Sequence, residues 1–539
     1  MKTRTIFNPE TKVWSAPTRP YTFGEKSVGE VIMESLKNRP DRIVEICHDT
    51  GRKVTARELH KESVNAARTY LQMGLKEDDV VLLLLNNHLF VSPMVLGASY
   101  IGATFCALEL GLSRKDLRNL IYQLQPKVIC CEKTEFIKVK SITTELDLRC
   151  EVFVNNPLHP NSVENLFGDF GDHESFVATK LRNVENRAAA ILSSSATMGT
   201  YKLISVSHPQ LLHNYTNDFG IIETVFTYST LSWITGIGTL LGSIILNLRR
   251  VITAKPFRPE DLLEIISKYS VNLLLLQPDR LNATLRCPKI DETNMDSLYV
   301  VMVTGKPLSP HMKVKLEKYL TMGAIVTTYG MTEMAGTITS SLYSSDKEGS
   351  AGVLVDNTRA KICDEFGYPQ DPRQVGEICI HGEFKFLGYY NNPKLTEASL
   401  DDEGYLKTGD IGYFDEEGEL YIVDRKKDTI VVGKHFVYPS ILEGIILEHP
   451  GVYDVCIIEV PHPELSFIPV AAVIRANGSN VTASEIVEFV AKRQPPELQL
   501  KGGAVFVNDL PKTASGKFKR YLVRETVTKQ LADNNKQMR

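Results

Sequence analysis

Apolar runs and helical repeats alternate along the first 420 or so residues of the chain. Val80–Leu85 is a run of six apolar residues, which is typical of a strand buried on both faces. Ala56–Leu75 has apolar residues at helical spacing and reaches a glycine at Gly74. Such strand–helix alternation predicts α/β layers with mostly parallel sheets. The same patterns predict helices at Pro93–Ile101, Leu262–Tyr269 and His311–Tyr319, and strands or short apolar stretches at Ala103–Leu108, Val128–Cys131, Ala188–Leu192, Val271–Leu276, Tyr299–Val303 and Ala324–Thr327.

The pattern changes after about Gly376. Short strands with glycine turns are expected at Gly376–His381, Leu420–Val423 and Ile430–Val432, which predicts a β-rich subdomain. The charged run 424–428 precedes a compact α+β pattern. We therefore predict a large N-terminal domain over residues 1–423, a hinge at 424–428 and a small C-terminal domain over 429–539. In the small domain, helices are expected at Pro439–Glu448 and Ala483–Arg493, and strands at Val455–Val460, Val470–Arg475 and Ala504–Val507.

One uncharged stretch could be mistaken for a membrane span. No charged residue occurs between Glu223 and Arg249. Threonine, serine, glycine and asparagine are scattered through this stretch, whereas a membrane helix needs about 20 predominantly apolar residues. The stretch is interpreted as a buried loop at 228–230, a helix at Ile234–Asn247 and a strand at Arg250–Thr253, so no transmembrane segment is expected.

Composition narrows the class of protein. The formal net charge of −4 and the pI of about 6.3 exclude a strongly basic nucleic-acid binder. Nine cysteines occur without a CxxC pair, which argues against a zinc site and a disulfide framework. The N-terminus lacks the apolar stretch of a signal peptide and the C-terminus lacks a Ser-Lys-Leu-type address. An intracellular protein with reduced thiols is expected.

Two polar segments follow predicted strands and suit phosphate chemistry. Residues 193–202 combine hydroxyls and small residues with Lys202, and backbone N–H groups with a lysine can cradle phosphate oxygens. A Ser/Thr-rich surface turn is the alternative. Residues 328–333 set a hydroxyl and a carboxylate beside Gly330, which could hold a metal-bound phosphate. Its alternative is an ordinary turn.

Two further segments lie nearer the C-terminus. Asp410, in Thr408-Gly409-Asp410, is interpreted as a loop carboxylate that could accept both ribose hydroxyls, and Arg425 follows shortly after it. Residues 510–517 predict a flexible turn that presents Lys517 to an anion. Taken alone, this segment could equally be a solvated basic loop.

In this order and spacing, the four segments resemble the adenylate-forming superfamily, in its branch of acyl-CoA synthetases, 4-coumarate–CoA ligases and beetle luciferases. The resemblance covers about residues 20–525. The matching motifs are Tyr329-Gly330-Met331-Thr332-Glu333 for YGxTE, Gly388-Tyr389-Tyr390-Asn391-Asn392-Pro393 for GYYNNP, Tyr405-Leu406-Lys407-Thr408-Gly409-Asp410 for (W/Y)-(L/F)-x-T-G-D, and Pro511-Lys512-Thr513 with Gly516-Lys517 for PKTxxGK.

The resemblance implies a two-step reaction in which a carboxylate attacks the α-phosphate of ATP and coenzyme A then takes the acyl group. It implies an N-terminal adenylation domain, a mobile C-terminal lid, and ATP, Mg²⁺ and coenzyme A as ligands. By resemblance Thr332 contacts phosphate, Glu333 serves Mg²⁺, and Lys517 stabilises charge during adenylation. It also implies nucleotide binding by Ser194, Ser195, Thr197, Gly199, Lys202, Tyr329, Gly330, Asp410 and Arg425, a substrate pocket at Trp233 and Gly305, and a hinge at Asp424.

The chain departs from the family's pattern in three places. Against the phosphate motif SSGTTGxPKG, residues 194–203 carry Ala196, Met198, Tyr201 and Leu203. Trp233 stands where many relatives have a histidine, and is interpreted either as an aromatic lining of the acyl pocket or as an indole facing the carboxylate. Gly433-Lys434 stands where relatives usually have Lys-Gly, a lysine that helps the thioester step in some of them.

Two functional classes stay open on these grounds. One is an acyl-CoA synthetase for a medium- or long-chain fatty acid. The other is a catalytically weakened or inactive homologue that binds nucleotide or acyl ligand, with luciferase-like oxygenation as a third possibility. The resemblance implies a peroxisomal or cytoplasmic location, and protein partners cannot be inferred from the sequence.

Overall fold

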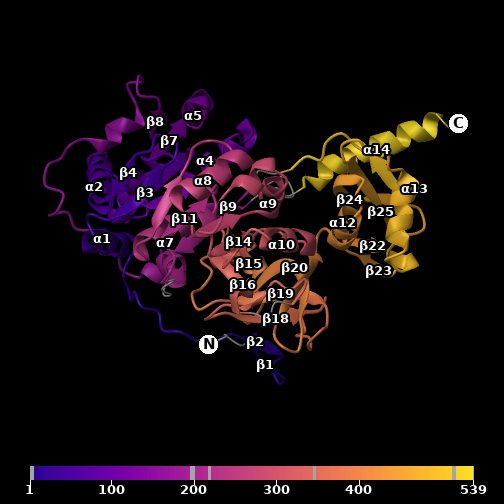
Figure 1. Ribbon diagram of the computed structural model, residues 1–539. Helices are drawn as coiled ribbons and strands as arrows, with labels where there is room; N and C mark the ends of the chain where they lie inside the picture. Colours follow the sequence, from indigo (N-terminus) through magenta and orange to yellow (C-terminus); the bar gives the residue numbers. More distant parts are fainter. Residues whose placement is uncertain (1–4, 195–200, 216–219, 344–346, 513–517, 538–539) are drawn as a thin grey trace.

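The computed structural model describes residues 5–194, 201–215, 220–343, 347–512 and 518–537. These residues form four sheets. Three sheets build a large N-terminal part, and the fourth belongs to a small C-terminal part that lies to one side of it (Figure 1). The α/β fold class predicted from the sequence, with a large and a small domain, is confirmed.

The first sheet has six strands in the order β10-β9-β6-β5-β7-β8. Odd-numbered residues of the central strand β5 pack toward α1–α3, and even-numbered ones toward α4 and α5. This strand is therefore buried on both faces, as its apolar run predicts. The elements are α1 (Val28–Asn38), α2 (Ala56–Gln72), β5 (Val80–Leu84), α3 (Val91–Tyr100), β6 (Thr104–Ala107), α4 (Arg114–Leu124), β7 (Val128–Glu132), α5 (Lys133–Glu145), β8 (Glu151–Asn155), β9 (Ala188–Ser194), β10 (Lys202–Ser207) and α6 (His208–Leu212).

The second sheet has nine strands in the order β17-β16-β15-β14-β13-β11-β12-β3-β4. Its six middle strands are parallel, and α8–α10 cover one of its faces. The elements are β3 (Ile43–Cys47), β4 (Lys53–Thr55), β11 (Thr224–Thr227), α7 (Ile234–Ile245), β12 (Arg249–Ile252), α8 (Pro259–Tyr269), β13 (Leu273–Leu276), α9 (Pro278–Leu285), β14 (Val300–Thr304), α10 (Pro310–Glu317), β15 (Ala324–Met331), β16 (Gly336–Ser340) and β17 (Val353–Leu354).

The third sheet is antiparallel and forms the predicted β-rich subdomain. Its order is β1-β2-β18-β19-β20-β21, so residues near the N-terminus pair with a strand more than 340 positions later. Trp14 of β2 stacks on Phe414 of β20 in its core. The elements are β1 (Ile6–Asn8), β2 (Val13–Ser15), β18 (Arg359–Cys363), β19 (Gly376–His381), α11 (Pro393–Ser399), β20 (Leu406–Phe414) and β21 (Leu420–Arg425).

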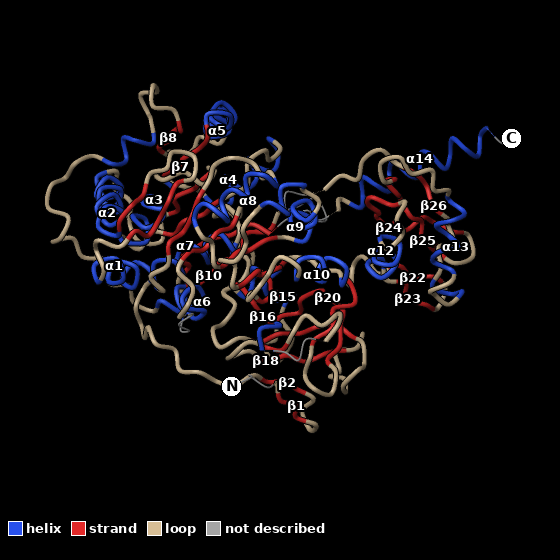
Figure 2. Tube along the Cα trace, in the orientation of Figure 1, coloured by secondary structure: helices blue, strands red, loops and turns tan. Residues whose placement is uncertain are grey.

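The fourth sheet contains only strands that follow the charged run at 424–428. Long strands β24 and β25 pair antiparallel, and α12–α14 pack around them (Figure 2). The α+β pattern predicted for this region is confirmed, while the hinge stays a prediction. The elements are β22 (Ile430–Val432), β23 (His435–Val437), α12 (Pro439–Leu447), β24 (Val452–His462), β25 (Ser466–Arg475), α13 (Ala483–Ala491), β26 (Ala504–Phe506) and α14 (Arg520–Gln537).

The uncharged stretch folds as a globular segment. The predicted helix is α7 and the predicted strand is β12, and the predicted loop precedes α7. The structure adds the strand β11, which was not predicted from the sequence. β11 is a four-residue strand with threonines at both ends, and it is fully buried in the middle of the sheet. Among the described residues, no helix is long and apolar enough to cross a membrane.

Candidate functional site

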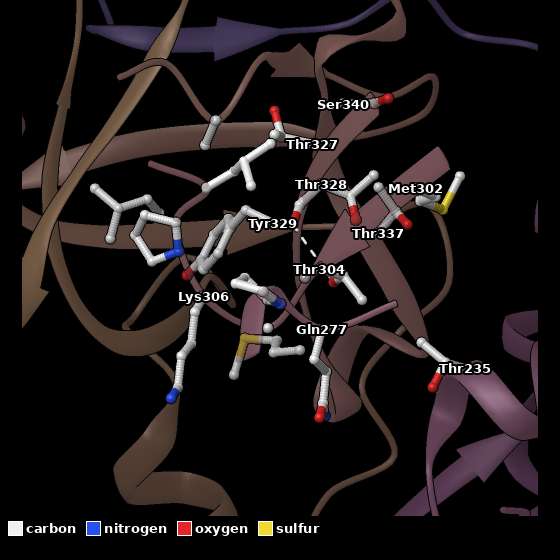
Figure 3. A pocket seen from close by; sticks show the side chains of 18 of the residues that line it. Thr235, Gln277, Met302, Thr304, Lys306, Thr327, Thr328, Tyr329, Thr337 and Ser340 are labelled. Atoms are coloured by element: carbon white, nitrogen blue, oxygen red, sulfur yellow. Dashed lines mark hydrogen bonds between the residues drawn. The ribbon is translucent and has the colours of Figure 1, made fainter. Parts of the chain in front are cut away.

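A large cavity opens where the second and third sheets meet the C-terminal part. Its volume is about 2570 Å³, well above the roughly 300–1,000 Å³ of an ordinary ligand pocket. The excess arises because an inner channel beside the second sheet continues into the cleft between the two parts of the molecule. Figure 3 shows the inner region, with side chains of β14, β15 and β16 around the hollow.

Asp410, Arg425 and Tyr329 form a connected group at this cavity. The Asp410 carboxylate is buried and lies 2.7 Å from Arg425 Nε and 2.7 Å from the Tyr329 hydroxyl, which donates to it. Burial and the Asp410 charge raise the pKa of Tyr329, so the phenol keeps the proton that it donates. The structure thus joins three predicted nucleotide-binding residues into one ion pair and hydrogen-bond chain.

The expectation that Asp410 lies on a loop is wrong. Thr408, Gly409 and Asp410 lie within β20, and Asp410 is the cross-strand partner of Arg425 in β21. Gly409 has a φ of +71°, which explains the glycine, since residues with a Cβ rarely adopt that conformation. A paired strand holds the carboxylate more rigidly than a loop would.

Glu333, Tyr389 and Lys202 form a second group. The Tyr389 hydroxyl donates to Glu333 Oε1 at 3.0 Å, and Lys202 Nζ lies 4.8 Å from the centre of the Tyr389 ring. Burial and Glu333 raise the pKa of Tyr389, so it too stays a donor. The three residues come from segments far apart in the sequence, and all of them line the cavity.

Residues 328–333 do not form an ordinary turn, which was the alternative interpretation of this segment. β15 continues through Tyr329 and Gly330 to Met331, and Thr332 and Glu333 lie in the short 3-10 helix Thr332–Met334 that follows. A Cβ on Gly330 would come within 2.2 Å of the carbonyl oxygen of Gly336 on β16. Gly330 is therefore required by the close approach of two strands, and the strand end delivers Thr332 and Glu333 to the cavity.

Residues 193–202, the polar segment that the sequence suggested for phosphate binding, join two antiparallel strands. Ser194 ends β9, Lys202 begins β10, and the two are cross-strand partners that both line the cavity. The predicted site residues Ser195, Thr197 and Gly199, together with Lys517, lie outside the described residues. Their assigned roles stay predictions.

The inner channel runs along the second face of the nine-stranded sheet. Alternate residues of β11, β13 and β14 line it, while the residues between them pack under α8–α10. Central parallel strands are ordinarily covered on both faces, so this open face marks a space for a ligand. Ile325 and Thr327 of β15 also border the cavity, but they pair with Val301 and Val303 and so lie on the face that α8–α10 cover. The channel-lining side chains of the other three strands are Val225, Thr227, Leu273, Leu275, Met302 and Thr304.

α7 forms the opposite wall of the channel. Trp233 occupies the N-cap position of this helix, is half-buried and lines the cavity, and Gly238 and Gly242 line it further along the helix. Gly305 lies just after β14, has a φ of +92° and also borders the cavity. Trp233 and Gly305, the two residues predicted for the substrate pocket, therefore both border the cavity.

Asp424 connects the large part to the small part. Its carboxylate accepts hydrogen bonds from the Ser440 N–H at 2.8 Å and the Ser440 hydroxyl at 2.9 Å. Ser440 lies in the first turn of α12, whose N-cap residue Tyr438 makes no side-chain cap. Asp424 therefore caps this helix from the end of β21, and burial raises its pKa despite these donors.

Sequence reasoning missed two residues of the site. Tyr389 was quoted within a motif but not assigned to the site, although an aromatic hydroxyl in a matching motif was a usable signal. Lys427 lines the cavity beside Arg425 and Lys202, and burial lowers its pKa. Its position in a charged run looks like that of a solvated residue, so the sequence carried no signal for it.

Glu333 fits a magnesium ion held together with substrate phosphates. Mg²⁺ commonly takes one or two protein carboxylates and completes its shell with water and phosphate oxygens. In the described part of the chain, no cluster of three or more His, Cys, Asp or Glu side chains could hold a metal by itself. One carboxylate beside the Thr332 hydroxyl is consistent with a phosphate-bound ion rather than with a closed protein cage.

Comparison with known proteins identifies the family of the chain. The sequence profile of the AMP-binding enzymes matches residues 32–390, and that of the AMP-binding enzyme C-terminal domain matches residues 442–517. The chain is 27% identical to luciferin 4-monooxygenase of Photinus pyralis over 95% of this chain and 96% of the relative. It is 28% identical to a 4-coumarate–CoA ligase of Humulus lupulus over 92% of this chain and 93% of the relative.

Solved structures share the fold over nearly the whole chain. ATP-bound MatB from Rhodopseudomonas palustris superposes with a TM-score of 0.84 at 23% identity, over 92% of this chain and 98% of that one. An anthranilate CoA ligase in complex with anthranoyl-AMP superposes with a TM-score of 0.85 at 19% identity, over 95% of this chain and 99% of that one. Since the AMP-binding profile covers well over half of the residues, the chain belongs to the AMP-binding enzymes, the adenylate-forming family of acid–CoA ligases and luciferases.

Proposed function

We propose that the protein is an AMP-forming acid–CoA ligase that activates a medium- or long-chain fatty acid. The observation that carries the proposal is the continuity of the cavity. The charged group of Asp410, Arg425 and Glu333 and the apolar channel beside β13–β15 belong to one hollow, so a nucleotide and an apolar carboxylate can meet in it.

The proposed reaction has two steps. A carboxylate oxygen attacks the α-phosphorus of ATP, the bond to the β-phosphate oxygen breaks, and pyrophosphate leaves. The thiol of coenzyme A, after losing its proton, then attacks the acyl carbon of the adenylate, so that a thioester forms and AMP leaves. Both steps add negative charge around the α-phosphate or the acyl oxygen, and cations aimed there lower the barrier.

The described residues divide this work between binding and charge stabilisation. Asp410 accepts the ribose hydroxyls, with Arg425 and Tyr329 holding the carboxylate in place. Lys202, beside Tyr389, supplies positive charge to phosphate oxygens, and Lys517 does so during adenylation. Bound Mg²⁺ at Glu333 neutralises phosphate charge.

The channel supports an acid with an extended apolar body. From Gln277, at the end of β13, to Leu273 the strand rises about 13 Å at roughly 3.3 Å per residue. Leu273, Leu275 and Met302 line this length together with Leu246 and Leu248. An alkyl chain that leaves water for this surface gains roughly 0.8 kcal/mol per buried CH₂ group, which favours long acids over acetate.

Acid-dependent ATP–pyrophosphate exchange tests the proposal. Exchange with saturated acids of increasing length should rise to an optimum and should collapse in Lys517→Ala. Absence of exchange across fatty and aromatic acids, with AMP or acyl ligand still bound, would instead support the weakened homologue. The four substitutions at Ala196, Met198, Tyr201 and Leu203 are the observation that favours this second candidate.

A second experiment tests the channel itself. Leu273→Trp fills the end of the channel that is farthest from Gln277. We therefore expect kcat/KM to fall by at least about 10-fold for long acids and little for short ones, because each methylene group that no longer fits loses its contact with the pocket. Leu158→Trp, the same substitution at an exposed position outside the cavity, is the control. Equal losses for short and long acids would argue against this channel as the acyl site.

A further inference from the structure

The rim of the cavity carries a set of contacts between the two parts of the molecule. α9 and the loop after β14 belong to the large part, and both lie on the side that faces the C-terminal part (Figure 1). The C-terminal part contributes the start of β24 and the chain around Lys512 and Phe518. Asp279, Lys306, Asp454, Lys512 and Phe518 all border the cavity.

Lys306 is held at this rim by a carboxylate. Its Nζ lies 3.0 Å from Asp279 Oδ2 and 3.3 Å from Asp279 Oδ1. Figure 3 shows the Lys306 side chain extending away from Thr304 and Tyr329, that is, away from the inner channel. The ion pair therefore fixes the direction of the ammonium group outside the space that an acid would fill.

The Lys306 ammonium group also lies over the ring of Phe518, a residue of the C-terminal part. Lys306 Nζ lies 5.6 Å from the ring centre, within the range of cation–π attraction. Lys512 Nζ also lies 4.8 Å from the ring, and it is anchored by Asp454 at 2.6 Å. Lys512 and Phe518 form a β-bridge with each other, so the ring is attached firmly to the C-terminal part.

Two further observations place this contact at a real junction between the parts. The pKa of Lys512 is raised, against the effect of burial, by Asp454 and also by Asp279 of α9. Arg286, which directly follows α9, lies over the Tyr453 ring at 5.7 Å from its centre. Charges and rings of α9 and the Lys306 loop thus meet those of the C-terminal part at several points.

We infer that Lys306 is a positioning residue that seats the C-terminal part for adenylation, by holding the Phe518 ring with its ammonium group across the rim of the cavity. Phe518 directly follows Lys517, to which the proposed function assigns charge stabilisation in the first step. Because one peptide bond joins the two residues, a contact that anchors Phe518 at the rim is expected to affect the step assigned to Lys517. The inference rests on the proposed function, and it predicts an effect on the first half-reaction alone.

The test compares the two half-reactions in the full-length protein. Lys306→Met and Phe518→Leu should each lower the kcat of ATP–pyrophosphate exchange by about 3- to 30-fold, the range expected for a partly desolvated cation–π contact. The KM for ATP should change little, and transfer from a supplied acyl-adenylate to coenzyme A should be unchanged. Lys306→Arg should retain most of the exchange, because a guanidinium group can make both contacts.

A double variant and a matched control make the test specific. Lys306→Met combined with Phe518→Leu should be no slower than Phe518→Leu alone, because Phe518→Leu already removes the Lys306 contact along with those of Lys512 and Arg520. Lys318→Met, which removes a lysine exposed at the end of α10, should exchange like the wild type. Additive losses, equal losses in both half-reactions, or a raised KM for ATP with normal kcat would overturn the inference.

Hydrogen–deuterium exchange provides a readout that needs no activity. Phe518→Leu should speed amide exchange in residues 278–286 and 305–309, more than 200 positions away, and Lys318→Met should not. Unchanged exchange in both segments would overturn the inference. A wild type that exchanges no pyrophosphate with any acid would overturn the proposed function, and the amide measurement would still decide whether Lys306 and Phe518 hold the parts together.

Discussion

At the scale of single side chains, the site depends on a few buried charges that have specific partners. The Asp410 carboxylate is buried, and Arg425 and Tyr329 both bind it. A buried charge without such partners would be costly, so these contacts support the fold and the binding site at once.

The Tyr329 hydroxyl gives a prediction at this scale. Tyr329→Phe removes one donor to a buried carboxylate, so the free energy of unfolding should fall by about 1.5–3 kcal/mol. Urea unfolding followed by fluorescence of Trp14, which packs in the same sheet as Asp410, would measure the change. Tyr413→Phe is the matched control, since Tyr413 stacks on Tyr421 and no hydrogen bond of its hydroxyl is seen in the described structure. An equal loss in the control would contradict the assignment.

Glu109 gives a prediction on pH. Burial raises its pKa from the ordinary 4.5 to about 6, although Lys519 of the C-terminal part lowers it somewhat, and its Oε1 is buried without a partner among the described residues. Between these two values the folded protein binds more protons than the unfolded chain, so this group makes stability fall as pH rises from 4.5 to 6.

Glu109→Gln should abolish that part of the pH dependence and raise the free energy of unfolding at pH 7 by about 1–2 kcal/mol. Urea unfolding at pH 4.5, 6 and 7 measures the free energy of unfolding of the variant and the wild type. Glu151→Gln, at an exposed position, is the control. A variant that follows the wild-type pH curve would contradict the prediction.

At the scale of elements, the ends of strands determine which groups reach the cavity. β15 ends at Met331 and delivers Thr332 and Glu333, β9 and β10 bring Ser194 opposite Lys202, and β21 ends in Asp424 and Arg425. Asp424 then caps α12, so one strand end serves both the proposed nucleotide site and the first helix of the small domain.

The cap of α12 is testable. Asp424→Ala leaves the Ser440 N–H and hydroxyl without their acceptor. It should speed amide exchange in the first turn of α12, with a loss of about 1 kcal/mol, as for other N-cap deletions. Asp424→Asn keeps an acceptor of the same shape and should lie between the alanine variant and the wild type. Unchanged exchange in both variants would mean that water satisfies these groups equally well.

The effect of the altered residues between β9 and β10 on catalysis can also be tested. Ala196→Gly combined with Met198→Thr restores two residues of the family's phosphate motif, and ATP–pyrophosphate exchange should rise. Glycine permits backbone conformations that alanine disfavours, and the threonine hydroxyl can bond phosphate. Met322→Thr, at an exposed position before β15, is a control for the same substitution elsewhere. An unchanged rate would show that the altered segment suffices for catalysis.

At the scale of the whole molecule, the proposed reaction needs the small part to serve two steps. Lys434 lies exposed at the turn between β22 and β23, after Gly433 with its φ of +63°. If it substitutes for the lysine that relatives carry one position earlier, Lys434→Ala should slow transfer to coenzyme A by about 10-fold or more and leave adenylation unchanged. Half-reaction rates measure this, with Lys492→Ala on the same domain as control. A loss in adenylation instead would contradict the role.

Much of the fold and the site could be predicted from local pattern. Val80–Leu85 indicated a doubly buried strand, the change of pattern after Gly376 indicated the β-rich subdomain, and four short motifs identified the family. These predictions succeed because side-chain periodicity and turn chemistry are properties of neighbouring residues. β11 was missed because four residues with terminal threonines carry too little periodicity to distinguish a buried strand from a loop.

The sequence by itself determined the family, the two-part organisation and the residues Asp410, Arg425, Tyr329 and Glu333 as candidates for the site. Only the tertiary structure decided that Asp410 lies in a strand and receives the hydroxyl of Tyr329, 81 positions away. It also decided that one face of the nine-stranded sheet stays open as a channel, and that Lys306 meets Phe518 across the cleft. The physical reason is that such contacts depend on how distant segments pack together, and local spacing along the chain does not specify that packing.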